Sequence, residues 1–376
     1  MKFIANSKLI ERQLGRIQGA VPSKSMLPII ENFLFEVDGT LQSLKASATN
    51  LETSMQVSIP IETKEREAKI SVAVPVKVFI DTIKNLAEQP ITVEVTEEFG
   101  IVIYSDTGKY KISGEDGTNY PPIPTYESAS ELVIASEILL RGISSVLFAA
   151  SNDEDRAALN GMLFYIQKES ITFVATDAHR LGKYVRNDAG AEPAKFTVPK
   201  KALLLIKNSI TSSAANMHIY YNENNAFFVT DNITLVCRLI DQKYPNYDNV
   251  IPRDNPNKMS INKSEFVSAL KRMNIFANKI SHQVKLDFTK DSLEISTEDY
   301  DYANEAKETL RCIYEGEPLT IGFNAAFLLE VIQNVETGNI SMEMSMPNRA
   351  AIIFPEEQIV NENILMLIMP IMLNNK

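Results

Sequence analysis

The sequence has few residues of the kinds that build disulfide frameworks and metal sites. Of its 376 residues only two are cysteines, Cys237 and Cys312, and only three are histidines. The cysteines have no CxxC spacing, which favours free structural thiols in a reducing cytoplasm over a disulfide framework or a zinc site. We therefore expect no metal and no cofactor.

Long hydrophobic runs are also missing. No stretch of about 18 apolar residues occurs, as a membrane-spanning helix would need. The N-terminal Met1-Lys2-Phe3 is not followed by the apolar segment of a signal peptide. With 45% hydrophobic and 23% charged residues, the chain has the composition of an ordinary globular protein, and we expect it to be cytoplasmic.

The sequence has fewer basic than acidic residues. Lys and Arg number 37 against 48 Asp and Glu, which gives a net charge of −11. A protein that binds nucleic acid over its whole surface is expected to be basic. Any contact with DNA must therefore be local.

Common catalytic and nucleotide-binding motifs are absent: GxGxxG, GxxxxGK[ST], HExxH and GxSxG do not occur. The one segment that resembles a chemical site is 176–181, where Asp177 and His179 are candidates for a metal or acid-base pair. A metal site needs further ligands at suitable spacing, and the sequence offers none nearby. A strand end that shapes a loop is the favoured interpretation.

The sequence repeats itself three times. A strand-type start followed by a helical apolar row begins at Phe3, at Leu132 and at Met259. In each copy apolar residues follow at offsets of seven and eleven: Ile10 and Leu14, Leu139 and Ile143, Phe266 and Leu270. This period is too long for a solenoid and suits whole domains.

Proline-rich connectors separate the repeats. Residues 120–124 and 244–252 contain aromatic residues and prolines, which do not continue helices or central strands. We expect three domains, 1–125, 126–252 and 253–376, here called repeats one, two and three. In repeat one the pattern predicts a helix ending near Ile17, strands at 33–37, 41–48, 56–61 and 70–74, a helix at 76–86, and strands at 91–95, 101–104 and 110–112. The fold class is α+β, with two helices on antiparallel sheet in each repeat.

Basic residues recur on the helix faces opposite the apolar stripes. Lys8, Arg12 and Arg16 follow one another at a spacing of four and point away from Ile10 and Leu14. Similar positions are held by Lys77, Lys84, Arg141, Lys200, Lys207, Lys263 and Lys271. Exposed faces often carry cations for solubility alone. Recurrence in an acidic protein instead favours a positive track that contacts phosphates without reading sequence.

Four segments, 159–164, 176–181, 244–247 and 369–371, closely resemble the bacterial DNA polymerase III β subunit family, the sliding clamps. The likeness runs in order along the whole chain and includes 27–29 and 322–324. The resemblance implies three domains of the clamp fold, a head-to-tail homodimer that closes into a ring, and helices that line the central hole. It implies a processivity factor without catalytic activity that encircles double-stranded DNA regardless of sequence. The implied protein partners are the DNA polymerase III α subunit, the clamp loader, and other polymerases and repair proteins.

The resemblance also assigns residues. It places the basic helix faces in the DNA channel and adds Lys24 and Arg156. It implies a peptide pocket formed by Leu159, Thr176, Ala178, His179, Arg180, Leu181, Pro245, Val250, Leu367, Met369, Pro370, Ile371 and Met372. It implies a dimer contact of Tyr110 and Ile112 with Ile275 and Phe276. Asn249 and Met372 stand where the family often has arginine, and 374–376 extend past its usual end.

Two other functions stay open at this point. One is an enzyme centred on Asp177 and His179. The other is a protein-interaction scaffold of three α+β domains without a role on DNA.

Overall fold

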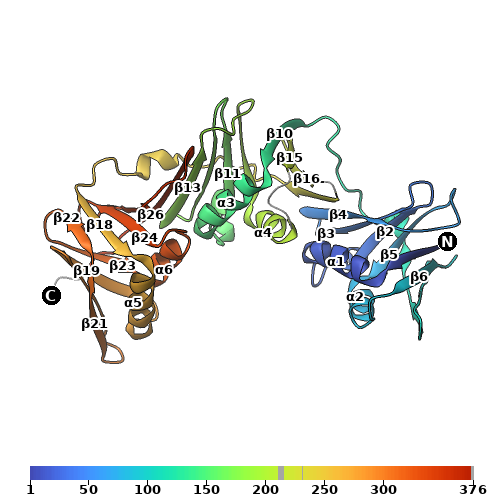
Figure 1. Cartoon of the computed structure of the whole chain (residues 1–376), viewed down its shortest axis with the longest axis horizontal. Coiled ribbons are helices and arrows are strands. Elements are labelled where there is room, and N and C mark those ends of the chain that lie inside the picture. The colour runs from blue at the N-terminus through green and yellow to red at the C-terminus, as the bar shows by residue number, and fades with distance from the viewer. Residues whose placement is uncertain (211–215, 231, 374–376) are drawn as a thin grey trace. The chain divides into compact units, whose positions relative to one another are not determined.

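The computed structural model describes residues 1–210, 216–230 and 232–373 (Figure 1). The chain divides into two compact units. Unit 1 comprises Met1–Glu137 and Lys201–Leu239, and unit 2 comprises Ile138–Lys200 and Ile240–Lys376. Among the described residues no helix has the length and apolar character to span a membrane.

Each repeat opens with a strand that leads directly into a helix, as predicted. The three pairs are β1 (Lys2–Asn6) with α1 (Ser7–Ile17), β10 (Ser130–Ala135) with α3 (Ser136–Val146), and β18 (Asn257–Asn262) with α5 (Lys263–Phe276). The Asn6 side chain accepts a hydrogen bond from the amide of Leu9 at 3.0 Å, and Asn262 does the same for Glu265 at 3.2 Å. These caps satisfy amides at the helix start that have no partner within the helix.

A second strand and helix follow in each repeat and confirm its doubled organisation. They are β5 (Lys69–Pro75) with α2 (Val76–Lys84), β14 (Ala194–Pro199) with α4 (Lys200–Ser209), and β23 (Leu319–Asn324) with α6 (Ala325–Gln333). Helix α2 ends two residues before the predicted Leu86, because the Leu86 amide donates to Ile83 in a tighter turn.

Unit 1 contains a nine-stranded and a four-stranded antiparallel sheet. The nine-stranded sheet has the order β10-β15-β16-β17-β4-β3-β2-β5-β9, and the four-stranded sheet has the order β1-β6-β7-β8. The strands not yet given are β2 (Asn32–Asp38), β3 (Ser43–Thr49), β4 (Thr53–Pro60), β6 (Pro90–Val95), β7 (Ile101–Tyr104), β8 (Lys109–Ile112), β9 (Glu115–Asp116), β15 (Asn216–Tyr221), β16 (Asn225–Thr230) and β17 (Ile233–Arg238). Strand β4 of repeat one pairs with β17 of repeat two, so one sheet continues across the repeat boundary.

Unit 2 has the same plan. Its sheets have the orders β14-β11-β12-β13-β26-β25-β24-β18-β22 and β21-β20-β19-β23. The remaining strands are β11 (Gly161–Ile166), β12 (Ile171–Thr176), β13 (Arg180–Arg186), β19 (Gln283–Thr289), β20 (Ser292–Asp299), β21 (Asn304–Arg311), β22 (Ile313–Glu315), β24 (Asn339–Met344), β25 (Ala351–Pro355) and β26 (Glu362–Ile368). Here β13 of repeat two pairs with β26 of repeat three. Pairing between repeats was not predicted from the sequence.

The hairpin predicted at Asp38-Gly39 has a longer turn than the sequence suggested. Strand β3 starts at Ser43 rather than 41, and β4 starts at Thr53 rather than 56. The Asp38 carboxylate accepts hydrogen bonds from the amides of Thr40 and Leu41 at 2.8 and 3.1 Å. These bonds hold residues 39–42 as a turn.

The helices bury the stripes that periodicity predicted. Ile10, Leu14 and Ile17 of α1 are all buried, and α1 packs against α2 and against strands β3 and β4. In the same unit Phe79 of α2 meets Phe35 of β2 edge to face, with ring centroids 5.3 Å apart. Helices and sheet thus share one apolar core in unit 1.

Two helical glycines give a matched test of this packing. A Cβ atom on Gly142 of α3 would lie 2.2 Å from the Phe173 ring, whereas one on Gly15 of α1 would meet nothing within 4 Å. We expect Gly142→Ala to lower the free energy of unfolding by about 1 to 3 kcal/mol through overpacking. Gly15→Ala should raise it by about 1 kcal/mol because alanine favours the helix.

Urea denaturation followed by circular dichroism measures both changes. Equal effects of the two substitutions would contradict the close approach of α3 to β12.

Candidate functional site

A cavity of about 280 Å³ opens within unit 2. Its walls come from the end of β12, the start of β13, the end of β26 and the connector between repeats two and three. The lining residues are Leu159, Thr176, Ala178, Arg180, Leu181, Pro245, Asn246, Tyr247, Val250, Leu367 and Met369. Nine of the thirteen residues assigned by resemblance therefore surround one cavity.

The floor of the cavity is apolar because two strands from different repeats meet there. Leu181 of β13 lies opposite Leu367 of β26, and both side chains are buried in a cluster with Tyr244 and Tyr247. Burial raises the pKa of the Tyr247 phenol to about 12, as expected for a ring in an apolar environment. The floor thus has the apolar character typical of ligand pockets.

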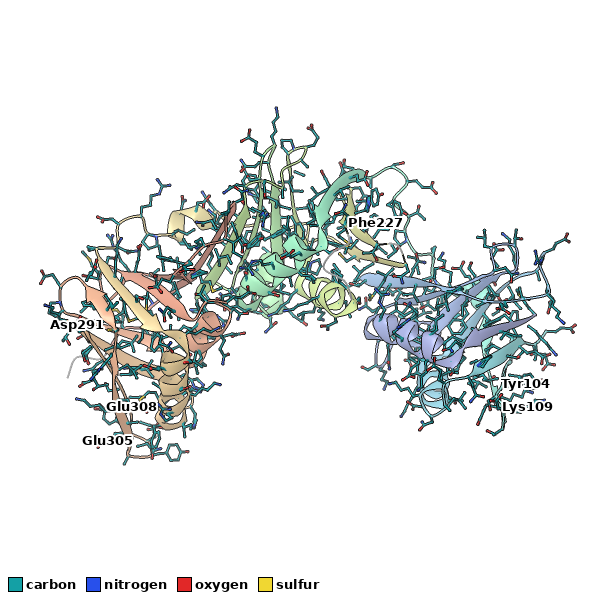
Figure 2. The ribbon with its side chains drawn as sticks, in the orientation of Figure 1. Tyr104, Lys109, Phe227, Asp291, Glu305 and Glu308 are labelled. Carbon is teal, nitrogen blue, oxygen red and sulfur yellow. The ribbon has the colours of Figure 1, made fainter. Side chains whose placement is uncertain are left out.

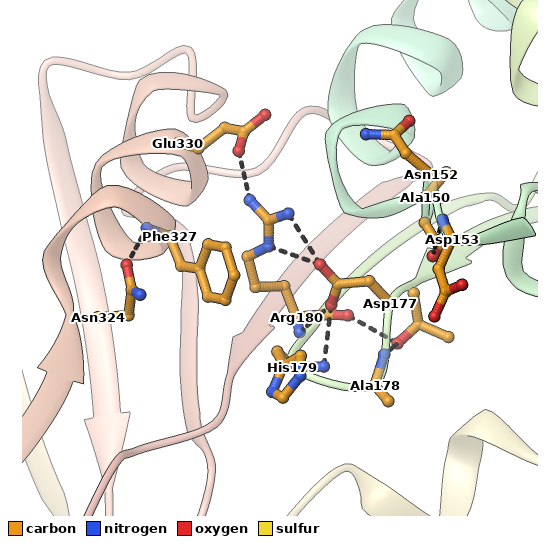
Figure 3. Close-up of polar contacts among 12 residues, drawn as sticks. Ala150, Asn152, Asp153, Asp177, Ala178, His179, Arg180, Asn324, Phe327 and Glu330 are labelled. Carbon is orange, nitrogen blue, oxygen red and sulfur yellow. Dashed lines mark hydrogen bonds and ion pairs between the residues drawn. The ribbon is translucent and has the colours of Figure 1, made fainter. Parts of the chain in front are cut away.

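The loop between β12 and β13 forms one wall (Figure 3). The Asp177 carboxylate accepts hydrogen bonds from the amides of His179 and Arg180 at 2.9 and 2.7 Å. The Thr176 hydroxyl donates to the Arg180 carbonyl at 2.6 Å and accepts from the Ala178 amide at 3.2 Å. These bonds hold Ala178 at a φ of 75°, a backbone conformation that non-glycine residues rarely adopt.

Arg180 is the charged member of the cavity wall, and its guanidinium is enclosed. It donates to the Asp177 carboxylate at 2.8 and 3.1 Å and also to Glu330 of α6. The guanidinium carbon lies 4.2 Å from the ring centroid of Phe327 and 5.9 Å from that of Phe148. The arginine thereby ties the loop of repeat two to a helix of repeat three.

The C-terminal segment continues from β26 past the loop. The Met369 amide donates to the His179 carbonyl at 2.8 Å, and the Ile371 amide donates to the Gly322 carbonyl at 2.9 Å. Met369 thereby lines the cavity, while the Ile371 backbone pairs with β23. Residues 374–376 lie outside the described part of the chain.

Four assigned pocket residues do not line the cavity: His179, Pro370, Ile371 and Met372. The exposed His179 ring faces Phe327 at a centroid distance of 5.9 Å, and the Met372 side chain is exposed. Two lining residues, Asn246 and Tyr247, were missed. Both belong to the 244–247 segment that carried the resemblance, and that segment was the signal available for them.

The segment with Asp177 and His179 is a loop at a strand end, as favoured from the sequence. The two oxygens of Asp177 accept bonds from two amides and from the Arg180 guanidinium. Within residues 1–210, 216–230 and 232–373 no group of three or more His, Cys, Asp and Glu side chains is placed to hold a metal ion. These contacts indicate that Asp177 has a structural role in the loop.

Half of the twelve cations assigned to DNA are engaged within the chain. In unit 1, Arg16 donates to the Ser209 carbonyl at 2.7 and 3.0 Å, and Lys8 pairs with Glu11 at 2.8 Å. In unit 2, Arg141 pairs with Glu336 and Glu362, Arg156 pairs with Asp153, Lys200 donates to Ala150, and Lys263 donates to Gln333 and Val335.

The other six cations have side chains without a hydrogen bond or ion pair among the described residues. They are Arg12, Lys24, Lys77, Lys84 and Lys207 in unit 1 and Lys271 in unit 2, and all six are exposed. Arg12 also acts on its neighbour, since burial and the nearby Arg12 charge lower the pKa of Arg16. These six cations are available to an external anion.

The residues assigned to a dimer contact lie at sheet and helix ends. Tyr110 of β8 and Ile275 and Phe276 of α5 are exposed, whereas Ile112 is buried within unit 1. Strands β8 and β21 each form the last strand of a four-stranded sheet. Figure 2 labels Lys109 on β8 and Glu305 and Glu308 on β21.

Comparison with known proteins assigns the chain along its whole length. Residues 1–124, 133–246 and 248–372 match the N-terminal, central and C-terminal domains of the DNA polymerase III beta subunit. The chain belongs to the DNA polymerase III beta subunit family. Its function is that of a sliding clamp, a non-catalytic processivity factor for a DNA polymerase.

Similar proteins agree with this family. The beta sliding clamp of Synechococcus elongatus is 26% identical over 383 residues and covers 100% of both chains. The beta sliding clamp of Vibrio cholerae is 25% identical and covers 99% of this chain and 100% of its own. The crystal structure of the beta subunit from Pseudomonas aeruginosa superposes with a TM-score of 0.92 at 24% identity, covering 99% and 100% of the two chains.

The pocket loop of this clamp has a counterpart in repeat one. Asn50 accepts bonds from the amides of Glu52 and Thr53 at 3.1 and 2.8 Å, as Asp177 does for His179 and Arg180. Leu51 has the same φ of 75° as Ala178. The loop in repeat two has an additional contact, because Asp177 also binds the buried Arg180 guanidinium.

This difference predicts unequal costs for the same truncation. Asn50→Ala should lower the free energy of unfolding by about 1 kcal/mol through lost backbone bonds. Asp177→Ala should lower the free energy of unfolding by about 3 kcal/mol, because it also leaves the buried Arg180 guanidinium with one carboxylate partner fewer.

Urea unfolding, together with hydrogen exchange at the amides of residues 178–180, measures the two costs. Equal destabilisation by both variants would show that the ion pair between Asp177 and Arg180 does not contribute to the free energy of unfolding.

Proposed function

We propose that this clamp closes into a ring as a head-to-tail homodimer around duplex DNA and tethers the replicative DNA polymerase III through its α subunit. The match of the whole chain to three beta subunit domains carries this proposal. Residues 1–125, 126–252 and 253–376 are its three clamp domains, and two copies supply six. We place this replication protein in the cytoplasm.

Two free sheet edges support the head-to-tail contact. The opposite ends of the same sheets have partners, since Ile4 of β1 bonds to Glu62 and Gly322 of β23 bonds to Ile371. Strands β8 and β21 each pair with one strand, and among the described residues no strand pairs with their outer edges. An unpaired edge is ready to bond to another chain, so β8 of one copy is expected to pair with β21 of the next.

The two edges carry side chains of opposite charge at a few positions. Strand β8 presents Lys109 and Lys111, both exposed, while β21 carries the exposed Glu305 (Figure 2). Glu308 of β21 already pairs with Arg272 of α5 at 2.6 Å, and Lys307 of β21 pairs with Glu294. Beside β21, Ile275 lies one residue before the end of helix α5 and is 64% exposed. Attraction between a lysine of β8 and Glu305 of β21 favours contact between these two edges.

A closed ring accounts for the few free cations in an acidic protein. Topology keeps the ring on DNA, so contacts with phosphates need only be weak and independent of sequence. The six exposed cations suit such contacts. Strong adhesion would need many more phosphate contacts, because each adds to the salt-dependent affinity.

The pocket supplies the tether. Its apolar floor, and the adaptable Met369 at its wall, suit short peptides with large apolar side chains. A ring that cannot leave DNA keeps a weakly bound partner at high local concentration. The clamp loader and other polymerases and repair proteins with clamp-binding peptides are expected to use the same pocket.

We expect Met369→Ala to weaken binding of a polymerase α-subunit peptide by about 1 to 3 kcal/mol, the range for a binding anchor. Met369 suits the test because its side chain is 39% exposed, whereas Leu181 is 1% exposed and its truncation would open a core cavity. Met346→Ala, at an exposed methionine outside the cavity, is the control.

Fluorescence anisotropy with a labelled peptide measures the affinities. Unchanged affinity in Met369→Ala would refute the pocket as the peptide site.

A further inference from the structure

The 13 methionines of the chain differ widely in their exposure to solvent. Eight of them are at most 2% exposed and belong to the apolar cores. Four are exposed: Met26, Met346, Met369 and Met372. An oxidant in solution reaches a thioether where the side chain is accessible, so these four are the methionines most open to oxidation.

One of the four lines the pocket. Met369 is the one sulfur-containing side chain among the described residues that surround the cavity. Its backbone is fixed, because its amide donates to the His179 carbonyl at 2.8 Å directly after β26 ends. Met372, in the same segment, is 73% exposed but does not line the cavity. Met369 is therefore both accessible to solvent and part of the pocket wall.

The surface around Met369 is mostly apolar. Six of the eleven lining side chains are hydrocarbon, namely Leu159, Ala178, Leu181, Pro245, Val250 and Leu367. Of the polar ones, the Thr176 hydroxyl donates to the Arg180 carbonyl at 2.6 Å, and the Arg180 guanidinium donates to Asp177 and Glu330. An apolar peptide side chain in the cavity thus packs against hydrocarbon and the Met369 thioether.

Oxidation changes this surface at one atom. The Met369 sulfur lone pair attacks one oxygen of hydrogen peroxide, the O–O bond breaks, and the sulfur becomes a sulfoxide while the peroxide is reduced to water. Water solvates the new S=O group while the pocket is empty. A peptide side chain that covers the group removes this water without replacing its hydrogen bonds, which weakens binding.

We propose that Met369 is an oxidation site that regulates the pocket: the thioether form binds peptides, and the sulfoxide form binds them more weakly. This inference rests on the proposed peptide-binding function of the pocket. Methionine sulfoxide reductase reverses the change with a dithiol, which is oxidised to a disulfide while the sulfoxide oxygen leaves as water. An oxidising environment therefore loosens the clamp's hold on its partners without unfolding the clamp.

Mild oxidation of the full-length protein with hydrogen peroxide tests the inference. Mass spectrometry measures the oxidised fraction at each methionine, and anisotropy with the labelled α-subunit peptide, added after the peroxide is removed, measures affinity. Oxidation of Met369 should weaken binding about tenfold. The free energy of unfolding in urea should change little, because Met369 is 39% exposed. Treatment with the reductase and dithiothreitol should restore the affinity.

Two leucine variants locate the effect, each compared with its own unoxidised form. Met369→Leu should show the same affinity before and after peroxide, because leucine has no sulfur. Met372→Leu is the matched control, since it removes the more exposed methionine of the same segment and keeps Met369. It should lose affinity on oxidation as the wild-type protein does.

The outcomes separate the inference from the function on which it rests. Unchanged peptide affinity after complete oxidation of Met369, or a loss that persists in Met369→Leu, overturns the oxidation switch and leaves the pocket intact. A loss that disappears in Met372→Leu overturns the assignment to Met369. Failure of the unoxidised wild-type protein to bind the peptide overturns the pocket function itself.

Discussion

The backbone pairing of β13 with β26 is the interaction on which the site depends. It joins two repeats into one sheet and sets Leu181 opposite Leu367, which makes the pocket floor. It also carries the chain beyond β26 to the loop, where the Met369 amide bonds to the His179 carbonyl. A shift of one residue in this register would turn the side chains of β26 to the other face, so the site would be lost while each repeat kept its own helices. The corresponding pairing of β4 with β17 in unit 1 shows that strand pairing is the general means of joining repeats in this clamp.

Basic side chains have two distinct uses in this acidic chain. Three arginines bind carbonyls or carboxylates across repeat boundaries: Arg16, Arg141 and Arg180. Their guanidinium groups are therefore engaged within the chain. The exposed cations, Arg12 and Lys77 among them, keep their charge for solvent or an external ligand. Arginine suits the first use because its planar fork binds two acceptors at once. A count of the basic residues on a helix is therefore larger than the number of cations that are free to contact DNA.

Sequence reasoning predicted what depends on local pattern. The apolar offsets after Phe3, Leu132 and Met259 predicted three strand-helix starts, and all three are present. Periodicity reports which face of a helix is buried, not what buries it. For that reason it did not reveal that β4 pairs with β17, or that Arg141 pairs with Glu362, more than 200 residues away. The pocket residues came from resemblance, and Tyr247 was missed because the connector has no period from which burial follows.

Retention on DNA tests the central claim, that a closed ring holds the duplex by topology. The clamp is loaded by a matching clamp loader onto nicked circular DNA, and the bound fraction is followed after the circle is linearised by one restriction cut. A topological ring predicts stable retention on the circle and rapid loss once ends exist, regardless of the sequence at the cut. Equal retention on circular and linear DNA would contradict the closed ring and show that the protein adheres to DNA instead.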